Sequence, residues 1–95
     1  MQLARVVGTV VSTRKEQSLS GLKLLVVRPL DEEGRESGNA IVSADAVGAG
    51  LDEVVLIAAG SSARQTVTTD KRPVDSVVMA IVDSWYVGDA QKYKK

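Results

Sequence analysis

The sequence predicts a mainly β protein, a small five-stranded barrel with one short helix, and three observations support this fold class. The 95-residue chain has the length of one domain and an ordinary globular composition, 44% hydrophobic and 25% charged. It contains 16 valines against eight leucines and no phenylalanine, and β-branched side chains favour pleated strands. Five apolar runs are separated by turn-forming clusters, as expected for short strands joined by loops.

The first two strands are predicted over residues 2–13 and 22–30. Gly8 interrupts the alternation of the first run, and a glycine inside a long strand commonly marks a bulge where the strand bends. The polar residues 14–21 are predicted to form an exposed loop. Pro29 has no N–H to donate, so this end of the second strand is expected at a sheet edge or a bulge.

The remaining strands are predicted over residues 40–44, 53–59 and 74–87, with a hairpin connection over residues 31–39. Gly60–Gln65 predicts a serine N-cap and one helical turn. One barrel domain is therefore expected over residues 1–87, followed by a flexible or partner-dependent tail over residues 88–95. A barrel of the oligonucleotide/oligosaccharide-binding (OB) type accounts for this pattern, although periodicity alone leaves a sandwich open.

Composition excludes several classes of function. The chain has no cysteine and no histidine, which removes disulfides, thiolate nucleophiles, imidazole bases and the usual zinc ligands. Twelve basic and twelve acidic residues give zero net charge, which argues against nucleic-acid and anionic-membrane binding. No apolar stretch approaches the roughly 20 residues of a membrane span, and residues 1–5 lack a signal-peptide layout, so a cytoplasmic protein without catalysis, cofactor or metal is expected.

Several motifs, in their order and spacing, resemble the vertex proteins of bacterial microcompartments, which include the carboxysome and ethanolamine-utilisation types. They are MQLARVVGTVVST at Met1–Thr13, GLKLLVV at Gly21–Val27, DAVGAG at Asp45–Gly50, GSSAR at Gly60–Arg64, PVD at Pro73–Asp75 and IVD at Ile81–Asp83. The resemblance implies a five-stranded barrel in a ring-shaped homopentamer that caps the corners of a polyhedral shell beside hexagon-forming shell proteins. The loops at 14–20 and 35–39 and the tail depart from the family pattern, so the type of compartment is left open.

The glycine-rich segment DAVGAG allows three interpretations. Its backbone amides could cradle a phosphate, but no helix or lysine follows at the required spacing. It could be a tight turn between two strands. In the third interpretation the small residues Gly48, Ala49 and Gly50 permit close approach near a five-fold axis or subunit contact, and the family resemblance favours this one.

The GSSAR motif could supply a serine nucleophile beside an arginine, but the chain has no histidine to act as its base. A capped helical turn is the simpler interpretation, with Arg64 paired to a carboxylate across a subunit contact. Asp75 and Asp83 are the candidate partners, so the predicted interface comprises Ser61, Ser62, Arg64, Asp75 and Asp83.

Two further features have competing interpretations. The acidic residues Asp31, Glu32, Glu33 and Glu36 suggest calcium, but their spacing fits a solvated hairpin tip better. Trp85 and Tyr86 are adjacent on a predicted strand, so they must point to opposite faces and cannot stack bases together. The rival to a structural shell protein is a binding module for single-stranded nucleic acid or a small ligand, and the neutral charge and the scarcity of aromatic residues weigh against it.

Overall fold

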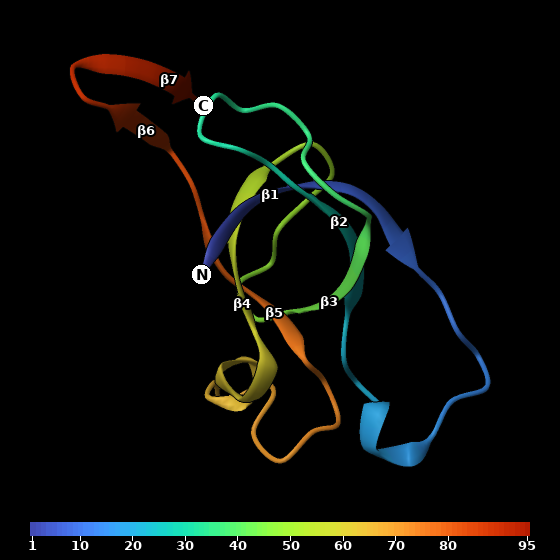
Figure 1. Cartoon of the computed structure of the whole chain (residues 1–95). Coiled ribbons are helices and arrows are strands. Elements are labelled where there is room, and N and C mark those ends of the chain that lie inside the picture. The colour runs from blue at the N-terminus through green and yellow to red at the C-terminus, as the bar shows by residue number, and fades with distance from the viewer.

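The computed structural model describes residues 1–95 and contains a closed barrel of five strands in the order β1-β2-β3-β5-β4 (Figure 1). The barrel strands are β1 (Gln2–Val10), β2 (Leu24–Pro29), β3 (Ile41–Asp45), β4 (Val54–Ala59) and β5 (Ser76–Ile81). All neighbouring pairs are antiparallel except β3 and β5, which are parallel. The predicted mainly β, five-stranded barrel is confirmed. The structure has no helix whose length and hydropathy would let it cross a membrane.

Strand β1 serves two neighbours because it bends at the predicted bulge. Its first half pairs with both β4 and β2, and its second half pairs with β2 alone. The register with β2 shifts between Val6 and Gly8, which leaves Val7 as the extra residue and turns its side chain outward. Pro29 lies beyond the last β2–β3 pair, so the missing N–H removes no bond from that ladder.

The barrel interior is filled by small and β-branched side chains, as the valine-rich composition requires. Only 20 of the 95 residues are buried, so the chain has a small core of its own. The largest buried cluster consists of Ala4, Val6, Leu25, Val27, Ala49, Val55, Ile57 and Val78.

The helical content differs from the prediction. The turn after β4 is a 3-10 helix, η2 (Gly60–Arg64), and no side chain caps it, because its N-cap residue is Ala59. The predicted serine N-cap is therefore wrong. A second 3-10 turn, η1 (Gln17–Leu19), lies in the segment predicted to be loop, where the Glu16 carboxylate accepts the Ser18 amide at 2.7 Å. Such short turns carry no apolar periodicity by which the sequence could reveal them.

The predicted single strand over residues 74–87 is wrong, because the chain leaves the barrel after β5. Val82 still donates its amide to Val54 at 2.8 Å, and the chain then forms β6 (Ser84–Val87). The segment 88–95 contains β7 (Ala90–Lys94), which pairs antiparallel with β6. This β6–β7 hairpin projects from one end of the barrel (Figure 1).

The β6–β7 hairpin is fastened to the barrel on both of its sides. Trp85 stacks on Tyr93 with ring centroids 5.1 Å apart, and its indole N–H donates to the Glu32 carbonyl at 2.9 Å. The Lys92 ammonium lies 2.7 Å from Glu33, in the connection between β2 and β3. The Lys95 ammonium lies 2.6 Å from Glu53, just before β4.

The Lys95–Glu53 pair changes the ionisation of both groups. The Lys95 ammonium and then the Gly50 amide donate to Glu53 and hold the pKa of its carboxyl below the ordinary value. The same bond to Glu53 raises the pKa of Lys95. Because the pKa of Glu53 is lowered, the stability that its carboxylate adds to the fold is lost as pH falls through the folded-state pKa of Glu53. Because the pKa of Lys95 is raised, the stability that its ammonium adds is lost only as pH rises through the folded-state pKa of Lys95.

We predict that Lys95→Met raises the pKa of Glu53 toward its ordinary value, because the largest stabilising contact of the carboxylate is removed. The titration is followed by NMR from the Glu53 side-chain carboxyl resonance. Lys94→Met is the matched control, since Lys94 is exposed and forms none of the ion pairs of the chain. An unchanged Glu53 titration in Lys95→Met would contradict the pairing.

Candidate functional site

The segment that joins β3 to β4 crosses the barrel, because β5 lies between these two strands in the sheet order. It begins on β5, where the Ala46 amide donates to Val78. It ends on β1, where Asp52 donates its amide to Val6 and the Val6 amide donates to Glu53, both at 2.9 Å. The glycine-rich motif lies within this crossing segment, which we define as residues 45–53.

The Asp45 carboxylate organises the first half of the crossing segment. Its side chain is 1% exposed, and it accepts the amides of Val47 and Gly48 at 3.1 Å and that of Ala49 at 3.0 Å. The Lys23 ammonium lies 3.7 Å from the carboxylate and donates to the Ala49 carbonyl at 3.1 Å. Hydrogen bonds to a charged acceptor are stronger than neutral ones, so this half of the segment has a defined shape.

The second half of the crossing segment is held by Glu53, whose carboxylate accepts the Gly50 amide at 2.6 Å. The four consecutive amides of residues 47–50 are therefore all bonded to carboxylates of the same chain. No amide of these four is left to bind a phosphate, and the carboxylates would repel one. The phosphate-loop interpretation is wrong.

The three residues of the predicted axis loop differ in exposure. Ala49 is fully buried and packs in the barrel core, Gly48 is exposed, and Gly50 is half-buried. Gly48 has φ +80°, a backbone conformation that residues with a Cβ rarely adopt. The Ala49 side chain thus belongs to the barrel itself, and only the glycines on either side of it are accessible to another chain.

The GSSAR motif forms η2, with Ala63 buried and both serines exposed. The Arg64 guanidinium donates to the Val74 carbonyl at 3.0 Å and forms no ion pair within the chain. Asp75 therefore lies next to the residue that Arg64 contacts, and its own carbonyl accepts the Gly60 amide at 2.9 Å. No base is bonded to either serine, so the motif lacks the arrangement of a nucleophilic site.

Asp83 lies apart from this group, at the start of the β6–β7 hairpin, where its carbonyl accepts the Lys95 amide at 2.8 Å. The structure thus brings Arg64 and Asp75 together and places Asp83 elsewhere. Both aspartates are exposed, and neither carboxylate has a cation within ion-pair distance in its own chain.

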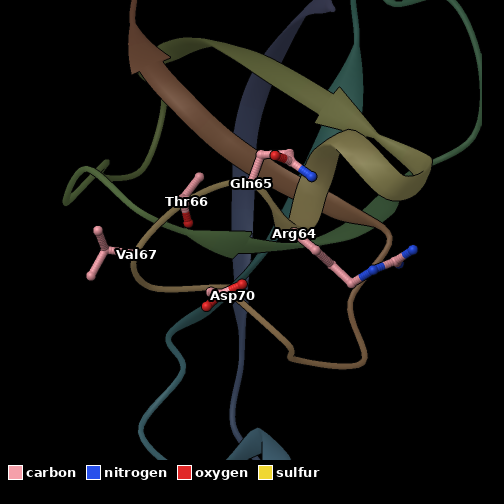
Figure 2. A pocket seen from close by; sticks show the side chains of 5 residues that line it. All are labelled: Arg64, Gln65, Thr66, Val67 and Asp70. Carbon is pink, nitrogen blue, oxygen red and sulfur yellow. The ribbon is translucent and has the colours of Figure 1, made fainter.

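A pocket of about 280 Å³ adjoins η2 and is lined by Arg64, Gln65, Thr66, Val67 and Asp70 (Figure 2). Arg64 and Val67 point to opposite sides of this region. The turn that follows η2 is held in place, because the hydroxyl of buried Thr69 bonds to the Ala63 carbonyl and to the Thr66 hydroxyl, both at 2.6 Å. The pocket contains no paired acid and base, so it presents a polar surface without the groups of a catalytic centre.

The acidic residues near 31–36 do not converge on a metal. The Asp31 carboxylate accepts the amides of Glu33 and Arg35 at 2.9 Å, as in a tight turn. Glu33 pairs with Lys92, and Glu36 lies 3.6 Å from Arg28. The structure has no group of three acidic side chains that could hold a metal ion, which favours the solvated-hairpin interpretation.

The Trp85 and Tyr86 prediction is confirmed. Trp85 packs inward against Tyr93 and the barrel end, whereas Tyr86 is exposed. Sequence reasoning did not find Tyr93 as the partner of Trp85, nor the roles of Asp45, Glu53 and Lys95. Residues 90–94 contain Tyr93 among mainly polar residues and show no period-2 alternation, so the sequence carried no clear signal for β7. No local sequence pattern predicts which backbone amides will donate to a given carboxylate.

The fold and these surfaces define a class of protein, a small β-barrel without a catalytic site. Its charged side chains without an ion-pair partner, such as Arg64 and Asp75, lie on the outside of the barrel. The family model described as "Ethanolamine utilisation protein EutN/carboxysome" matches residues 1–83. The chain belongs to this EutN/CcmL family of bacterial microcompartment shell vertex proteins.

Individual relatives agree with this assignment. The carboxysome shell vertex protein CcmL of Nostoc sp. PCC 7120 is 52% identical over all of this chain and 95% of its own length, and its structure superposes with a TM-score of 0.94. The vertex protein EutN of Salmonella typhimurium is 41% identical over all of this chain and 96% of its own length. The pentameric shell protein GrpN of Rhodospirillum rubrum has a TM-score of 0.83 and 47% identity, over 92% of this chain and 100% of GrpN.

This membership establishes what the chain does in general terms. It is a structural, non-catalytic protein of a bacterial microcompartment shell, a cytoplasmic organelle, and its place is the shell vertex. The prediction of a shell vertex protein without enzymatic activity is confirmed by these relatives.

We predict that Asp45→Ala lowers the free energy of unfolding by about 2–4 kcal/mol, because three amides of the crossing segment lose their charged acceptor. Urea denaturation at one fixed protein concentration measures the change. Asp89→Ala is the matched control, since Asp89 is exposed and its side chain has no bonded partner. Equal stability of the two variants would show that Asp45 does not organise the segment.

Proposed function

We propose that this chain forms a cyclic homopentamer that caps the five-fold corners of its shell. The observation that carries the proposal is the close likeness to GrpN, a shell protein described as pentameric, at 47% identity and TM-score 0.83. The small core supports it, since a 95-residue chain with 20 buried residues gains stability from further burial between subunits.

The geometry of a closed shell explains why such a ring is needed. Flat sheets of hexagonal units have no curvature, so a closed polyhedron requires corners of lower rotational symmetry. A ring of five identical subunits with heterologous contacts supplies such a corner. Hexagon-forming shell proteins are then the partners that surround each ring, and neither nucleic acid nor membrane is required.

Two surfaces of the barrel are proposed to make the subunit contacts. The first consists of the exposed η2 serines with Arg64 and Asp75, where opposite charges lie close together without an ion pair in the chain. Asp83, which the fold separates from this group, is proposed to meet a different part of the neighbour. The second surface is the backbone at Gly48 and Gly50, which small residues leave open to close approach near the axis.

The tail over residues 88–95 is proposed to be the partner-dependent part of the chain. It lies beyond the residues that the family model matches. It contains the second strand of the β6–β7 hairpin, which projects from the barrel, and the first strand of that hairpin has Tyr86 and Val87 exposed. One face of the hairpin is fastened to the barrel, and its exposed apolar side chains are available for a contact with a neighbouring shell protein.

We predict that native mass spectrometry at micromolar concentration finds five chains per particle, because the ring buries surface that the monomer exposes. Light scattering in solution is the independent measurement. A stable monomer at this concentration would contradict the proposal. A monomer that also binds labelled single-stranded DNA with micromolar affinity, weakened by salt, would support the binding-module alternative instead.

We predict that Arg64→Ala weakens the ring by about 2–5 kcal/mol per contact, because it leaves a carboxylate unpaired in the interface. The unfolding of the isolated chain should change less, since Arg64 donates only one bond within it, to the Val74 carbonyl. Dilution series followed by native mass spectrometry compare this variant with Arg14→Ala, an exposed arginine whose side chain has no bonded partner. If both variants assemble like the parent protein, Arg64 lies outside the interface.

A further inference from the structure

The β6–β7 hairpin is joined to the barrel by side chains alone. No backbone hydrogen bond connects residues 84–95 to a barrel strand, and the hairpin forms a two-stranded sheet of its own. The last backbone bond to the barrel is the one that the Val82 amide donates to Val54. Only Asp83 separates Val82 from the start of β6, so the hairpin can move relative to the barrel without breaking the pairing of any barrel strand.

The polar attachments of the hairpin lie at two different places on the barrel. The Trp85 indole and the Lys92 ammonium both bind to the β2–β3 connection. The Lys95 ammonium instead binds Glu53, at the end of the crossing segment. No other side chain of the hairpin bonds to that segment, so the Lys95–Glu53 pair is the one polar link between the two elements.

The Glu53 carboxylate uses its two oxygens for two different elements. Oε1 accepts the Gly50 amide and Oε2 accepts the Lys95 ammonium, both at 2.6 Å. The Glu53 side chain is 23% exposed, so a position in solvent is also open to it. A glutamate side chain is flexible, and the loss of one of its two partners frees it to leave the other.

The glycine turn, which we define as residues 48–51, is the part of the crossing segment that depends on Glu53. The amides before Gly50 are held by Asp45. The residues that follow the turn are fixed on β1 by their backbone bonds with Val6. The Gly50 amide lies between these two anchors and donates to Glu53 alone. A change at Glu53 therefore acts on the turn and not on its anchors.

We propose that Glu53 couples the β6–β7 hairpin to the glycine turn, so that a contact made by the hairpin changes the mobility of the turn. In the docked state, the carboxylate is fixed between Lys95 and Gly50. In the lifted state, Lys95 leaves with the hairpin, and the bond from the Gly50 amide to the carboxylate loses its fixed geometry. A partner that binds only the docked hairpin therefore tightens the turn. By linkage, a contact that fixes the turn favours docking of the hairpin to the same extent.

This coupling goes beyond the proposed ring and does not require it, because the contacts that carry it lie within one chain. Both coupled elements are surfaces proposed above for contacts with other chains. A neighbouring shell protein that lies against exposed Tyr86 of the hairpin thus acts on the turn without touching it.

The first experiment removes the Lys95 ammonium and observes the turn. In Lys95→Met, hydrogen exchange followed by NMR should show the Gly50 amide exchanging at least about fivefold faster than in the parent protein. The amides of residues 47–49, which are bonded to Asp45, should change by less than about twofold in the same spectra. Lys94→Met is the matched control, since Lys94 is exposed and forms no ion pair, and it should leave the exchange of Gly50 unchanged.

The second experiment changes the turn and observes the hairpin. A Cβ at Gly50 would lie 3.4 Å from the Glu53 carboxylate, close enough to displace it. Gly50→Ala should therefore speed the hydrogen exchange of the paired amides of β6 and β7 by at least about threefold. Gly8→Ala is the matched control, because Gly8 also lacks a left-handed φ and its added Cβ would meet Val26 at an ordinary 3.7 Å.

The proposal requires both responses, because coupling is reciprocal. It is overturned if Gly50 exchanges in Lys95→Met as it does in the parent protein, or if the hairpin exchanges in Gly50→Ala as it does in Gly8→Ala. Faster exchange in all barrel strands of Lys95→Met would also overturn it, because the ion pair would then stabilise the whole fold without a specific effect on the turn. Native mass spectrometry of the same samples tests the ring separately: a monomer that shows both responses contradicts the pentamer and leaves the coupling intact.

Discussion

The buried Asp45 carboxylate is the contact on which the rest of this structure depends. The connection from β3 to β4 has to cross the barrel past β5, and it does so without a helix or strand to satisfy its backbone. Asp45 accepts three of its amides and thereby directs the Ala49 side chain into the core. An apolar side chain there would leave the buried Ala49 amide unpaired, at a cost of about 1–3 kcal/mol, and would remove the charged acceptor of the part-buried amides of Val47 and Gly48.

A second carboxylate, that of Glu53, connects the crossing segment to the β6–β7 hairpin. Glu53 holds the Gly50 amide with one oxygen and the Lys95 ammonium with the other. The end of the crossing segment and the end of the β6–β7 hairpin therefore share one side chain. Trp85 and Lys92 fasten the other side of the hairpin to the β2–β3 connection. Two acidic residues and one aromatic pair thus join the core, the glycine segment and the hairpin into one unit.

The sequence was sufficient for the features that depend on local chemistry. Valine-rich runs predicted the five barrel strands, Gly8 predicted the bulge, and the adjacency of Trp85 and Tyr86 predicted their opposite faces. The break after β5 was missed because only Asp83 and Ser84 separate the apolar residues 77–82 from the apolar residues 85–87. The position of the break is imposed by the closure of the barrel on β4. The glycine motif was recognised, but the burial of Ala49 depends on contacts with strands far away in the chain.

The closed barrel also explains why the chain suits a shell vertex. A closed barrel has few free strand edges. The surfaces proposed for assembly are therefore limited to places such as the η2 turn with its arginine and the glycines of the crossing segment, and these two surfaces differ from each other, as the proposed heterologous ring requires. A structural shell protein needs neither histidine nor cysteine, and this chain has neither.

The central claim is that this chain closes a shell at its corners. The most direct test is electron cryomicroscopy of shells produced from the hexagon-forming proteins of the same compartment, with and without this chain. The account predicts closed, faceted particles with five-fold density at each corner when the chain is present, and open or elongated sheets when it is absent. Closed particles of the same shape without the chain, or corners that lack its density, would contradict the account.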